Sequence, residues 1–223
     1  MKRISIVWLA LFFLLCAVGA ALARAPAKKP EKKEKNLNQT KIIPKKAFHE
    51  ALIKLAKDER VPVASSTLVE KGRGEDYYAA EKILDQNPET FWAEGVKGSG
   101  KNEWVAFAIV EESTHLEITP GAGREQFENF NRPKILLVDI YQVKLPQKDD
   151  EYDPQFKWLG RATYNFQDKN VPVVQRLPVQ LPELAMGVRS MYVGVIILQD
   201  VYRGQFDDTA INEIKITAVW GAD

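Results

Sequence analysis

Two neighbouring stretches of the sequence carry residue types that are suited to binding ions or phosphate. The first, residues 85–92, reads DQNPETFW and gathers carboxylate, amide and hydroxyl oxygens in a tight turn. The second, residues 95–102, reads GVKGSGKN and departs only in its last residue from the phosphate-binding pattern G-x-x-x-x-G-K-[ST]. Both chemistries depend on the elements that surround these residues.

The surroundings of the glycine-rich stretch argue against a nucleotide site. The pattern needs a Ser or Thr hydroxyl for Mg²⁺ after the lysine, and this sequence has Asn102 there. It also needs a helix N-terminus aimed at the phosphates, whereas residues 103–110 are typical of a strand. We therefore expect no nucleotide here, but a surface loop with Lys97 and Lys101 in solvent.

Catalytic constellations are absent from the sequence. The two histidines, His49 and His115, lie far apart, and Ser65-Ser66 lacks a G-x-S-x-G elbow. No Cys/His cluster offers a zinc site. Paired carboxylates could hydrolyse glycosides, but an acidic surface produces such pairs by chance. The sequence therefore predicts a binding module and not an enzyme.

Charge is distributed unevenly along the 223 residues, although the net charge is only +1. Residues 24–60 contain 12 Lys/Arg and five Asp/Glu, and residues 61–223 contain 17 and 25. The second part is acidic, which argues against nucleic-acid binding there. Residues 24–43, rich in Ala, Pro, Lys and Glu, are expected to form a disordered basic linker.

The first 23 residues have the pattern of an export signal. Lys2 and Arg3 precede an apolar run, and residues 21–23 (ALA) fit a signal-peptidase site. We expect cleavage and a periplasmic or secreted protein. An uncleaved membrane anchor is the alternative, because the apolar run is almost long enough to span a bilayer. The only cysteine, Cys16, lies in this run, so the expected mature chain has no disulfide.

Residues 44–60 have the periodicity of an amphipathic helix. Phe48, Leu52 and Leu55 recur at helical spacing, and lysines cover much of the remaining surface. We expect this helix to dock on its own domain. Contact with a partner protein or a membrane surface is the alternative.

From residue 61 to 223 the sequence has the residue pattern of a single all-β domain. Short runs rich in β-branched and aromatic residues are separated by Gly, Pro, Asn and Asp clusters. The expected strands are 61–69, 103–110, 115–119, 134–143, 157–166, 171–181, 190–201 and 210–220. About eight strands without βαβ alternation predict a β-sandwich or jelly roll. In the last strand, Ile214 and Ile216 alternate with Glu213, Lys215 and Thr217, so these three are expected on the solvent face.

Four stretches resemble a known family in the order in which that family carries them. They are residues 64–68 (ASSTL), 84–92 (LDQNPETFW) with 94–98 (EGVKG), 131–134 (NRPK), and 201–204 (VYRG) with 207–211 (DDTAI). The chain from about 61 to 220 resembles a discoidin or coagulation-factor type C domain. It is most similar to the bacterial glycan-binding, translocation domain of a secreted NAD glycohydrolase toxin. The resemblance implies a galactose-binding-like jelly roll. It does not extend to the toxin's catalytic domain, so we do not expect the NAD glycohydrolase activity here.

The resemblance also implies a structural Ca²⁺ site in the turn before Trp92. It places Asp85, Asn87 and Thr90 there, with Glu213 as a closing ligand. Ca²⁺ prefers six to eight oxygen ligands of these kinds. Gln86 stands where the family usually has Gly, which weakens the expectation. The alternative is an Asx-turn in which these side chains bond only the local backbone.

A glycan partner is the other implication, with a protein partner or scaffold role as the alternative. Sugar recognition combines aromatic faces with planar hydrogen-bonding groups, here expected on loops at one rim of the sandwich. The candidates are Tyr77, Tyr78, Arg124, Asn129, Asn131, Tyr202 and Arg203. Trp92 and Trp104 are expected in the core, and Arg132 is expected to pair with Glu94 or Asp208.

Overall fold

A computed structural model describes residues 45–57, 61–145, 154–184, 186 and 189–218. The predicted signal segment (1–23) and basic linker (24–43) lie outside the described residues. Among the residues described, no helix is long and apolar enough to cross a membrane.

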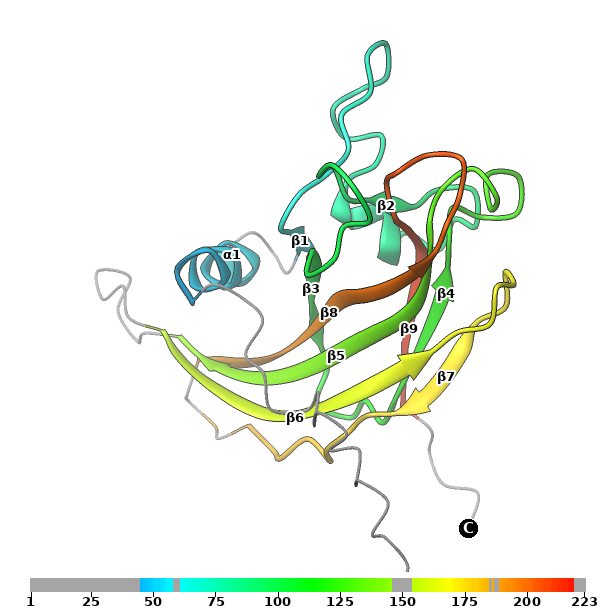
Figure 1. Ribbon diagram of the computed structural model, residues 1–223. Coiled ribbons are helices and arrows are strands. Elements are labelled where there is room, and N and C mark those ends of the chain that lie inside the picture. Colours follow the sequence, from blue (N-terminus) through cyan, green and yellow to red (C-terminus); the bar gives the residue numbers. More distant parts are fainter. Residues whose placement is uncertain (1–44, 58–60, 146–153, 185, 187–188, 219–223) are drawn as a thin grey trace, which may run out of the picture. The chain divides into compact units, whose positions relative to one another are not determined.

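The described chain folds into two antiparallel sheets that pack face to face (Figure 1). The five-stranded sheet has the order β1 (Val63–Ala64), β3 (Trp104–Ile109), β8 (Ser190–Tyr202), β5 (Arg132–Lys144) and β6 (Gln155–Asn165). The four-stranded sheet has the order β2 (Trp92–Ala93), β9 (Ala210–Thr217), β4 (His115–Pro120) and β7 (Val173–Arg176). The chain switches repeatedly between the sheets, which is the pattern of a jelly roll. The expected all-β fold with one short N-terminal helix is confirmed.

Individual strands depart from expectation where the sequence carries conflicting signals. The expected strand at 61–69 shrinks to Val63–Ala64, and the one at 171–181 shrinks to Val173–Arg176. Pro172 and Pro178 flank the second of these, and proline cannot donate to a strand ladder. The two-residue strand Trp92–Ala93 was missed because it is too short to show any alternation.

The main core lies between the two sheets. The inward residues of both sheets form one cluster, which includes Phe107, Ile118, Leu136, Tyr192 and Ile196. Trp92 is fully buried in this core, and its indole N–H donates to the carbonyl of Ser66 over 3.0 Å. Trp92 therefore fixes the chain that leaves the turn at residues 85–90.

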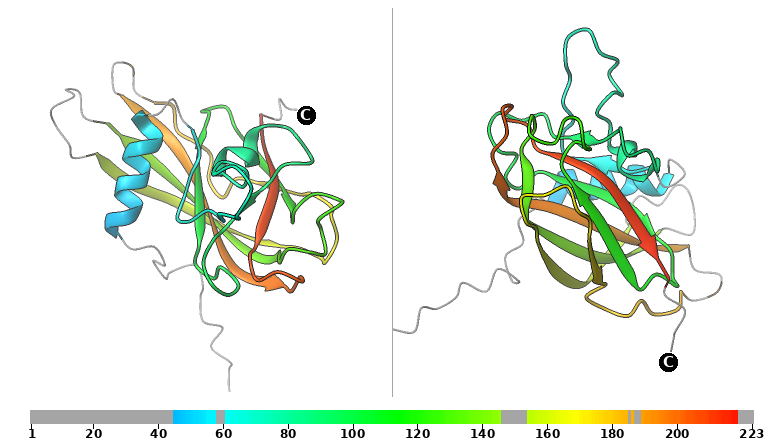
Figure 2. Two further views of the ribbon diagram at one scale, coloured as in Figure 1. Left: turned by 90° about the horizontal axis from the view of Figure 1, so that it is seen from above. Right: turned by 90° about the vertical axis from the view of Figure 1, so that its right-hand side faces the viewer.

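The outer face of the five-stranded sheet is covered by α1 (Lys45–Lys57), as the two views in Figure 2 show. Phe48, Leu52 and Leu55 are buried against this face, and the ring of Phe48 lies edge-on to Trp104 at 5.8 Å. The expected apolar stripe of the helix therefore packs on its own domain. This cover explains why β3 and β8 are apolar on both faces and not alternating.

A third, smaller cluster lies at the loop end of the sandwich. It contains Tyr78, Phe91, Ala93, Phe130 and Ala210, all buried. This cluster joins the loop before the 3₁₀ helix η2 (Ala80–Leu84) to the loop between β4 and β5. This cluster supports the two loops that carry the predicted glycan-contacting residues Tyr77, Tyr78, Arg124 and Asn129.

Candidate functional site: an aromatic groove beside an oxygen-rich turn

The turn at residues 85–90 is held by hydrogen bonds among its own oxygens and amides. The Asn87 N–H donates to Asp85 Oδ1 over 3.0 Å, and the Thr90 hydroxyl lies 2.8 Å from both Asp85 oxygens. The Glu89 N–H donates to Asn87 Oδ1 over 3.1 Å. Gln86 adopts a positive φ of 59°, the conformation that favours glycine. Gln86, which stands where the family usually has Gly, therefore adopts a backbone conformation that glycine also adopts.

Glu213 faces this turn from β9 and is buried, with 6% of its surface exposed. The expectation that Glu213 lies on a solvent face is therefore wrong, because the turn at 85–90 covers this end of the strand. Its Oε1 accepts from the Ile214 N–H over 3.3 Å, and its Oε2 has no hydrogen-bond partner. Burial, together with the nearby Asp85 charge, raises the pKa of Glu213 to about 7.

These groups fit a hard cation. Asp85 and Glu213 bring two carboxylates together, one with an unsatisfied oxygen, and unpaired buried carboxylates are costly. Carboxylate, hydroxyl and carbonyl oxygens are the donors that Ca²⁺ prefers. The described residues contain no group of three or more His, Cys, Asp or Glu that could hold a metal. A Ca²⁺ ion here would therefore depend on Thr90, Asn87 and backbone oxygens as well.

In the neighbouring glycine loop, residues 95–102, the amides of Gly95, Val96 and Asn102 are hydrogen-bonded within the chain itself. Glu94 is fully buried, and its carboxylate accepts from the N–H groups of Val96 and Thr209, each over 2.9 Å. The Gly95 N–H donates to the Ser66 hydroxyl over 3.1 Å. A Cβ at Gly100 would lie 2.4 Å from the Glu94 side chain, so the glycine permits this close packing. The Glu94 carboxylate therefore already accepts from the Val96 amide of the loop.

Burial raises the pKa of Glu94 to about 7, against the hydrogen bonds from Thr209 and Val96, which lower it. The charges of Asp208 and Glu103 add to the rise. This carboxyl group is therefore held in an environment that disfavours its ionised form.

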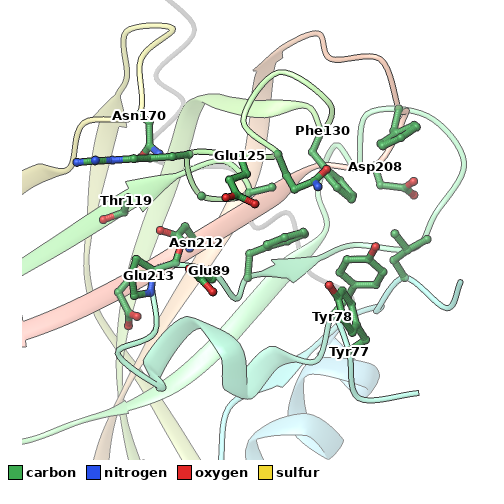
Figure 3. Close-up of a pocket in the computed structure, with 18 of the residues that line it drawn as sticks. Tyr77, Tyr78, Glu89, Thr119, Glu125, Phe130, Asn170, Asp208, Asn212 and Glu213 are labelled. Atoms are coloured by element: carbon green, nitrogen blue, oxygen red, sulfur yellow. Dashed lines mark hydrogen bonds between the residues drawn. The ribbon is translucent and has the colours of Figure 1, made fainter. Parts of the chain in front are cut away.

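An open groove of about 1150 Å³ lies beside both loops (Figure 3). Its lining comes from the loops at 68–78, 86–91, 122–130, 170–172 and 206–208, and from β4 and β9. Figure 3 places Tyr77 and Tyr78 on one side and Thr119 and Glu213 on the other, with Asn212 between them. The groove therefore runs from the aromatic cluster to the outer face of β4 and β9, the two inner strands of the four-stranded sheet.

Aromatic rings form one wall of the groove. Phe130 contacts Phe91 at 4.9 Å, Phe206 at 5.3 Å and Tyr78 at 5.8 Å between ring centroids. Tyr77 and Phe206 are the outermost of these rings, with 47% and 48% of their surface exposed. Exposed rings on a buried aromatic base can contact a ligand without losing their support.

The aromatic wall is held by a small polar network. The Tyr78 hydroxyl and Arg73 Nε both donate to Glu70 Oε2 over 2.7 Å, and the Arg73 guanidinium lies 4.2 Å from the Tyr77 ring centre. Burial and the Glu70 hydrogen bond raise the pKa of Tyr78 well above its usual value. Tyr78 is therefore a fixed support, and Tyr77 is the exposed partner of the pair.

Three of the seven predicted glycan-contacting residues line the groove, namely Tyr77, Tyr78 and Arg124. Arg124 is exposed on the loop between β4 and β5. Asn129 lies on the same loop outside the lining, and its amide donates to Gln126 over 2.7 Å.

The other three lie away from the groove. Asn131 is fully buried; its side chain binds the Asp207 carbonyl and accepts from the Gly204 N–H over 2.8 Å. The Tyr202 hydroxyl donates to the carbonyl of Phe166 over 3.0 Å, and Arg203 pairs loosely with Asp207 at 3.8 Å. Asn131 and Tyr202 therefore hold backbone together at the end of β8.

Several groove residues were missed by sequence reasoning. Phe206 and Glu125 lie in loops without any periodicity, and Asn212 sits in a strand that was expected to alternate. The Asn212 amide donates to the carbonyl of Pro88 over 3.1 Å and so ties β9 to the oxygen-rich turn. An isolated Asn between Ile211 and Glu213 was the only available signal.

Arg132 has a different partner from the two that were expected. Its guanidinium forms a two-bond contact with Asp168, 2.9 Å from Nε and 2.8 Å from Nη2. It also donates to the Arg203 carbonyl over 2.9 Å. The pairing with Glu94 or Asp208 is wrong because Glu94 is already occupied by backbone amides.

Two packed antiparallel sheets with a loop-lined groove define a discoidin-like β-sandwich. The sequence matches the family described as the NAD glycohydrolase translocation F5/8 type C domain over residues 57–217. The chain therefore belongs to this family, as the resemblance predicted.

No curated protein matches the chain. Among solved structures, it is similar to arabinofuranosyltransferase AftD from Mycobacteria, with 12% identity and a TM-score of 0.43 over 72% of this chain and 10% of that one. It is also similar to chitosan-binding module 2 of a Paenibacillus sp. IK-5 chitosanase/glucanase, solved with chitotriose, with 8% identity and a TM-score of 0.44 over 70% and 95% of the two chains. The CBM32 of AlyQ, solved with 4,5-unsaturated mannuronic acid, has 11% identity and a TM-score of 0.37 over 71% and 94%.

Proposed function

We propose that the chain is a non-catalytic module that binds glycan in the groove between the oxygen-rich turn and the aromatic wall. The observation that carries this proposal is an open groove of about 1150 Å³ whose wall presents two half-exposed rings, Tyr77 and Phe206. Sugar rings stack their C–H faces on aromatic side chains, which are themselves enriched where one side is apolar and the other wet.

Polar groups around these rings supply the rest of what a sugar needs. Arg124 offers a planar fork of N–H donors at the rim, and Glu89 and Glu125 offer acceptors. A concave site with an aromatic surface and a few polar groups is the usual form of a ligand pocket.

We propose in addition that the module is exported and that Asp85 and Glu213 help hold a structural Ca²⁺. The signal pattern at residues 1–23 supports export to the periplasm or beyond. The partnerless Glu213 oxygen beside Asp85 supports the ion. A bound ion would stiffen the turn whose Gln86, Pro88 and Glu89 line the groove.

A protein-scaffold role has less support from the structure. The helix stripe that suggested it is buried: Leu52 and Leu55 are fully covered by the domain's own sheet. Among the α1 side chains that the structure describes, Lys46 and Glu50 are exposed and lie 3.9 Å apart.

A glycan-array screen of the full chain, followed by titration of the best glycan, tests the proposed function. Phe206→Ala should weaken binding by about ten-fold, because it removes one stacking face. Trp158→Ala is the matched control, since Trp158 is also 48% exposed but lies on β6 outside the groove. Equal loss in both variants, or a screen without any bound glycan, would contradict the proposal.

A further inference from the structure

The charged side chains that line the groove are unequal in number. Six are acidic and four are basic: Glu70, Glu89, Glu117, Glu125, Asp208 and Glu213 against Lys71, Arg73, Arg124 and Lys215. The groove thus shares the acidic character of residues 61–223.

Two of the four cations are already paired within the groove. Arg73 donates to Glu70 over 2.7 Å, and Lys215 Nζ lies 3.4 Å from Glu117 Oε1. These pairs leave four carboxylates and two cations, Lys71 and Arg124.

The four remaining carboxylates have no ion pair within the described part of the chain. Glu213 also has a carboxylate oxygen without a hydrogen-bond partner. Its Oε2 is buried in the groove lining and has no hydrogen-bond partner within hydrogen-bonding geometry. A buried acceptor without a donor is costly, so a ligand that donates to it gains an interaction that water does not supply. When Ca²⁺ occupies Glu213, the acids Glu89, Glu125 and Asp208 still outnumber the two cations.

The acids are also dispersed. Figure 3 shows Glu213, Glu89, Glu125 and Asp208 at separate places along the groove, and the described residues hold no group of three or more His, Cys, Asp or Glu that could hold a metal. Dispersed carboxylates suit a ligand with several positive charges along its length better than they suit one ion. An aromatic wall beside them suits a sugar chain.

We propose that the groove selects a glycan chain that carries protonated amino groups, such as an oligomer of glucosamine, over neutral and acidic glycans. This inference rests on the proposed glycan-binding function and names the class of its ligand. The amines would meet Glu89, Glu125 and Asp208, while the sugar faces lie against Tyr77 and Phe206. Uronic acids would be repelled by the same carboxylates.

The test compares three oligomers of equal length, made of glucosamine, N-acetylglucosamine and a uronic acid, by calorimetric titration of the full chain at pH 6 in low salt. Each screened contact between an amine and a carboxylate contributes roughly two- to five-fold in affinity. We therefore expect the glucosamine oligomer to bind about ten-fold more tightly than its acetylated form, and to lose this advantage in 0.5 M NaCl. Runs with EDTA and with Ca²⁺ show whether Glu213 contributes.

Variants assign the preference to the groove. Asp208→Asn should weaken glucosamine binding about three-fold and leave binding of the acetylated oligomer unchanged. Glu125→Gln should also weaken glucosamine binding about three-fold, and by more than it weakens binding of the acetylated oligomer. Glu128→Gln is the control, because Glu128 is exposed on the same loop but does not line the groove.

The outcomes separate the two proposals. Equal affinity for the amine and acetylated oligomers overturns the charge preference and leaves glycan binding standing. A loss in Glu128→Gln as large as in Glu125→Gln also overturns it, because adsorption to the acidic surface would then explain the binding. Failure of all three oligomers, together with an empty glycan array, overturns both.

Discussion

The turn at residues 85–90 and the glycine loop at residues 95–102 look alike in sequence and differ in structure. Both contain residue types that bind charged ligands, and only four residues separate them. In the turn, a carboxylate oxygen of Glu213 is left without a partner. In the loop, the amides of Gly95 and Val96 are taken by Ser66 and Glu94.

The difference shows that unsatisfied groups, and not residue types, mark a potential site. Buried polar groups are nearly always paired, so the exceptions are informative. Glu94 accepts a hydrogen bond from the glycine loop, whereas Glu213 faces the turn with one carboxylate oxygen unpaired. Substitution of Glu94 should therefore lower the stability of the fold itself, whereas substitution of Glu213 should affect the binding of a cation.

The largest effect on stability is expected when the Glu94 side chain, which accepts from the glycine loop, is removed. Glu94→Ala leaves the buried N–H of Thr209 and the part-buried N–H of Val96 without acceptors, and a buried unsatisfied group costs about 1–3 kcal/mol. We expect a loss of about 3 kcal/mol in the free energy of unfolding, measured by urea denaturation. Glu125→Ala, an exposed control, should change it by less than about 0.5 kcal/mol. A similar small change in both variants would contradict the structural role of Glu94.

The next largest effect is expected from binding of Ca²⁺ at the turn. Ca²⁺ at about 100 times its dissociation constant should stabilise the fold by about 2.7 kcal/mol and raise Tm by several degrees. Differential scanning calorimetry against an EDTA baseline measures this shift. Glu213→Gln should abolish it, and Mg²⁺, which requires tighter octahedral geometry, should not reproduce it. No heat and no shift on titration would remove the metal from the turn.

A smaller effect is expected from pH. The pKa of Glu94 is about 7 in the fold and 4.5 as the reference value, so the folded state binds more protons between these limits. Stability should therefore fall as pH rises from about 4.5 to 7 and then level off. Comparison of unfolding at pH 5 and pH 7.5 should show a fall of about 1 kcal/mol or more from this group.

Glu94→Gln isolates that contribution, because Glu213 and the charges that face Glu94, Asp208 and Glu103, remain in both proteins. The variant should be less stable overall but should lose less on going from pH 5 to pH 7.5. A slope as steep as that of the wild type would assign the dependence elsewhere.

The smallest effect is expected from backbone conformation in the turn. A residue other than glycine in the left-handed region costs about 1–2 kcal/mol, and glycine costs about 0.5–1 kcal/mol of chain entropy. Gln86→Gly should therefore raise the free energy of unfolding by about 0.5 kcal/mol. Gln126→Gly, at a residue without this conformation, should lower it. Destabilisation in both variants would show that the Gln86 side chain contributes a contact.

The sandwich was largely predictable because its signals are local. Strands such as Trp104–Ile109 and Ser190–Tyr202 consist of β-branched and aromatic residues bounded by turn formers. The motif at residues 84–92 then identified the family. The continuous apolar character of these strands was less readable, since it follows from the cover that α1 provides on the outer face.

The groove was predictable only in part because it is assembled from distant loops. Tyr77 and Arg124 could be chosen by residue type, and both line the groove. Asn131 and Tyr202 have equally suitable types, yet their polar groups bond the backbone. Sequence cannot separate these cases, since the choice depends on contacts between loops that lie 36 to 76 residues apart. Whether any of these side chains contacts a glycan stays a prediction.

The buried anchors Glu94, Asn131 and Asn212 suggest how this domain could be re-engineered. Each binds main-chain groups: Glu94 those of Val96 and Thr209, Asn131 those of Asp207 and Gly204, and Asn212 that of Pro88. Because main-chain groups are common to all residues, the side chains between the anchors can be varied while the loop framework is kept. A combinatorial library that randomises residues 124–128 and 205–206 would therefore sample new ligand specificities on an unchanged scaffold.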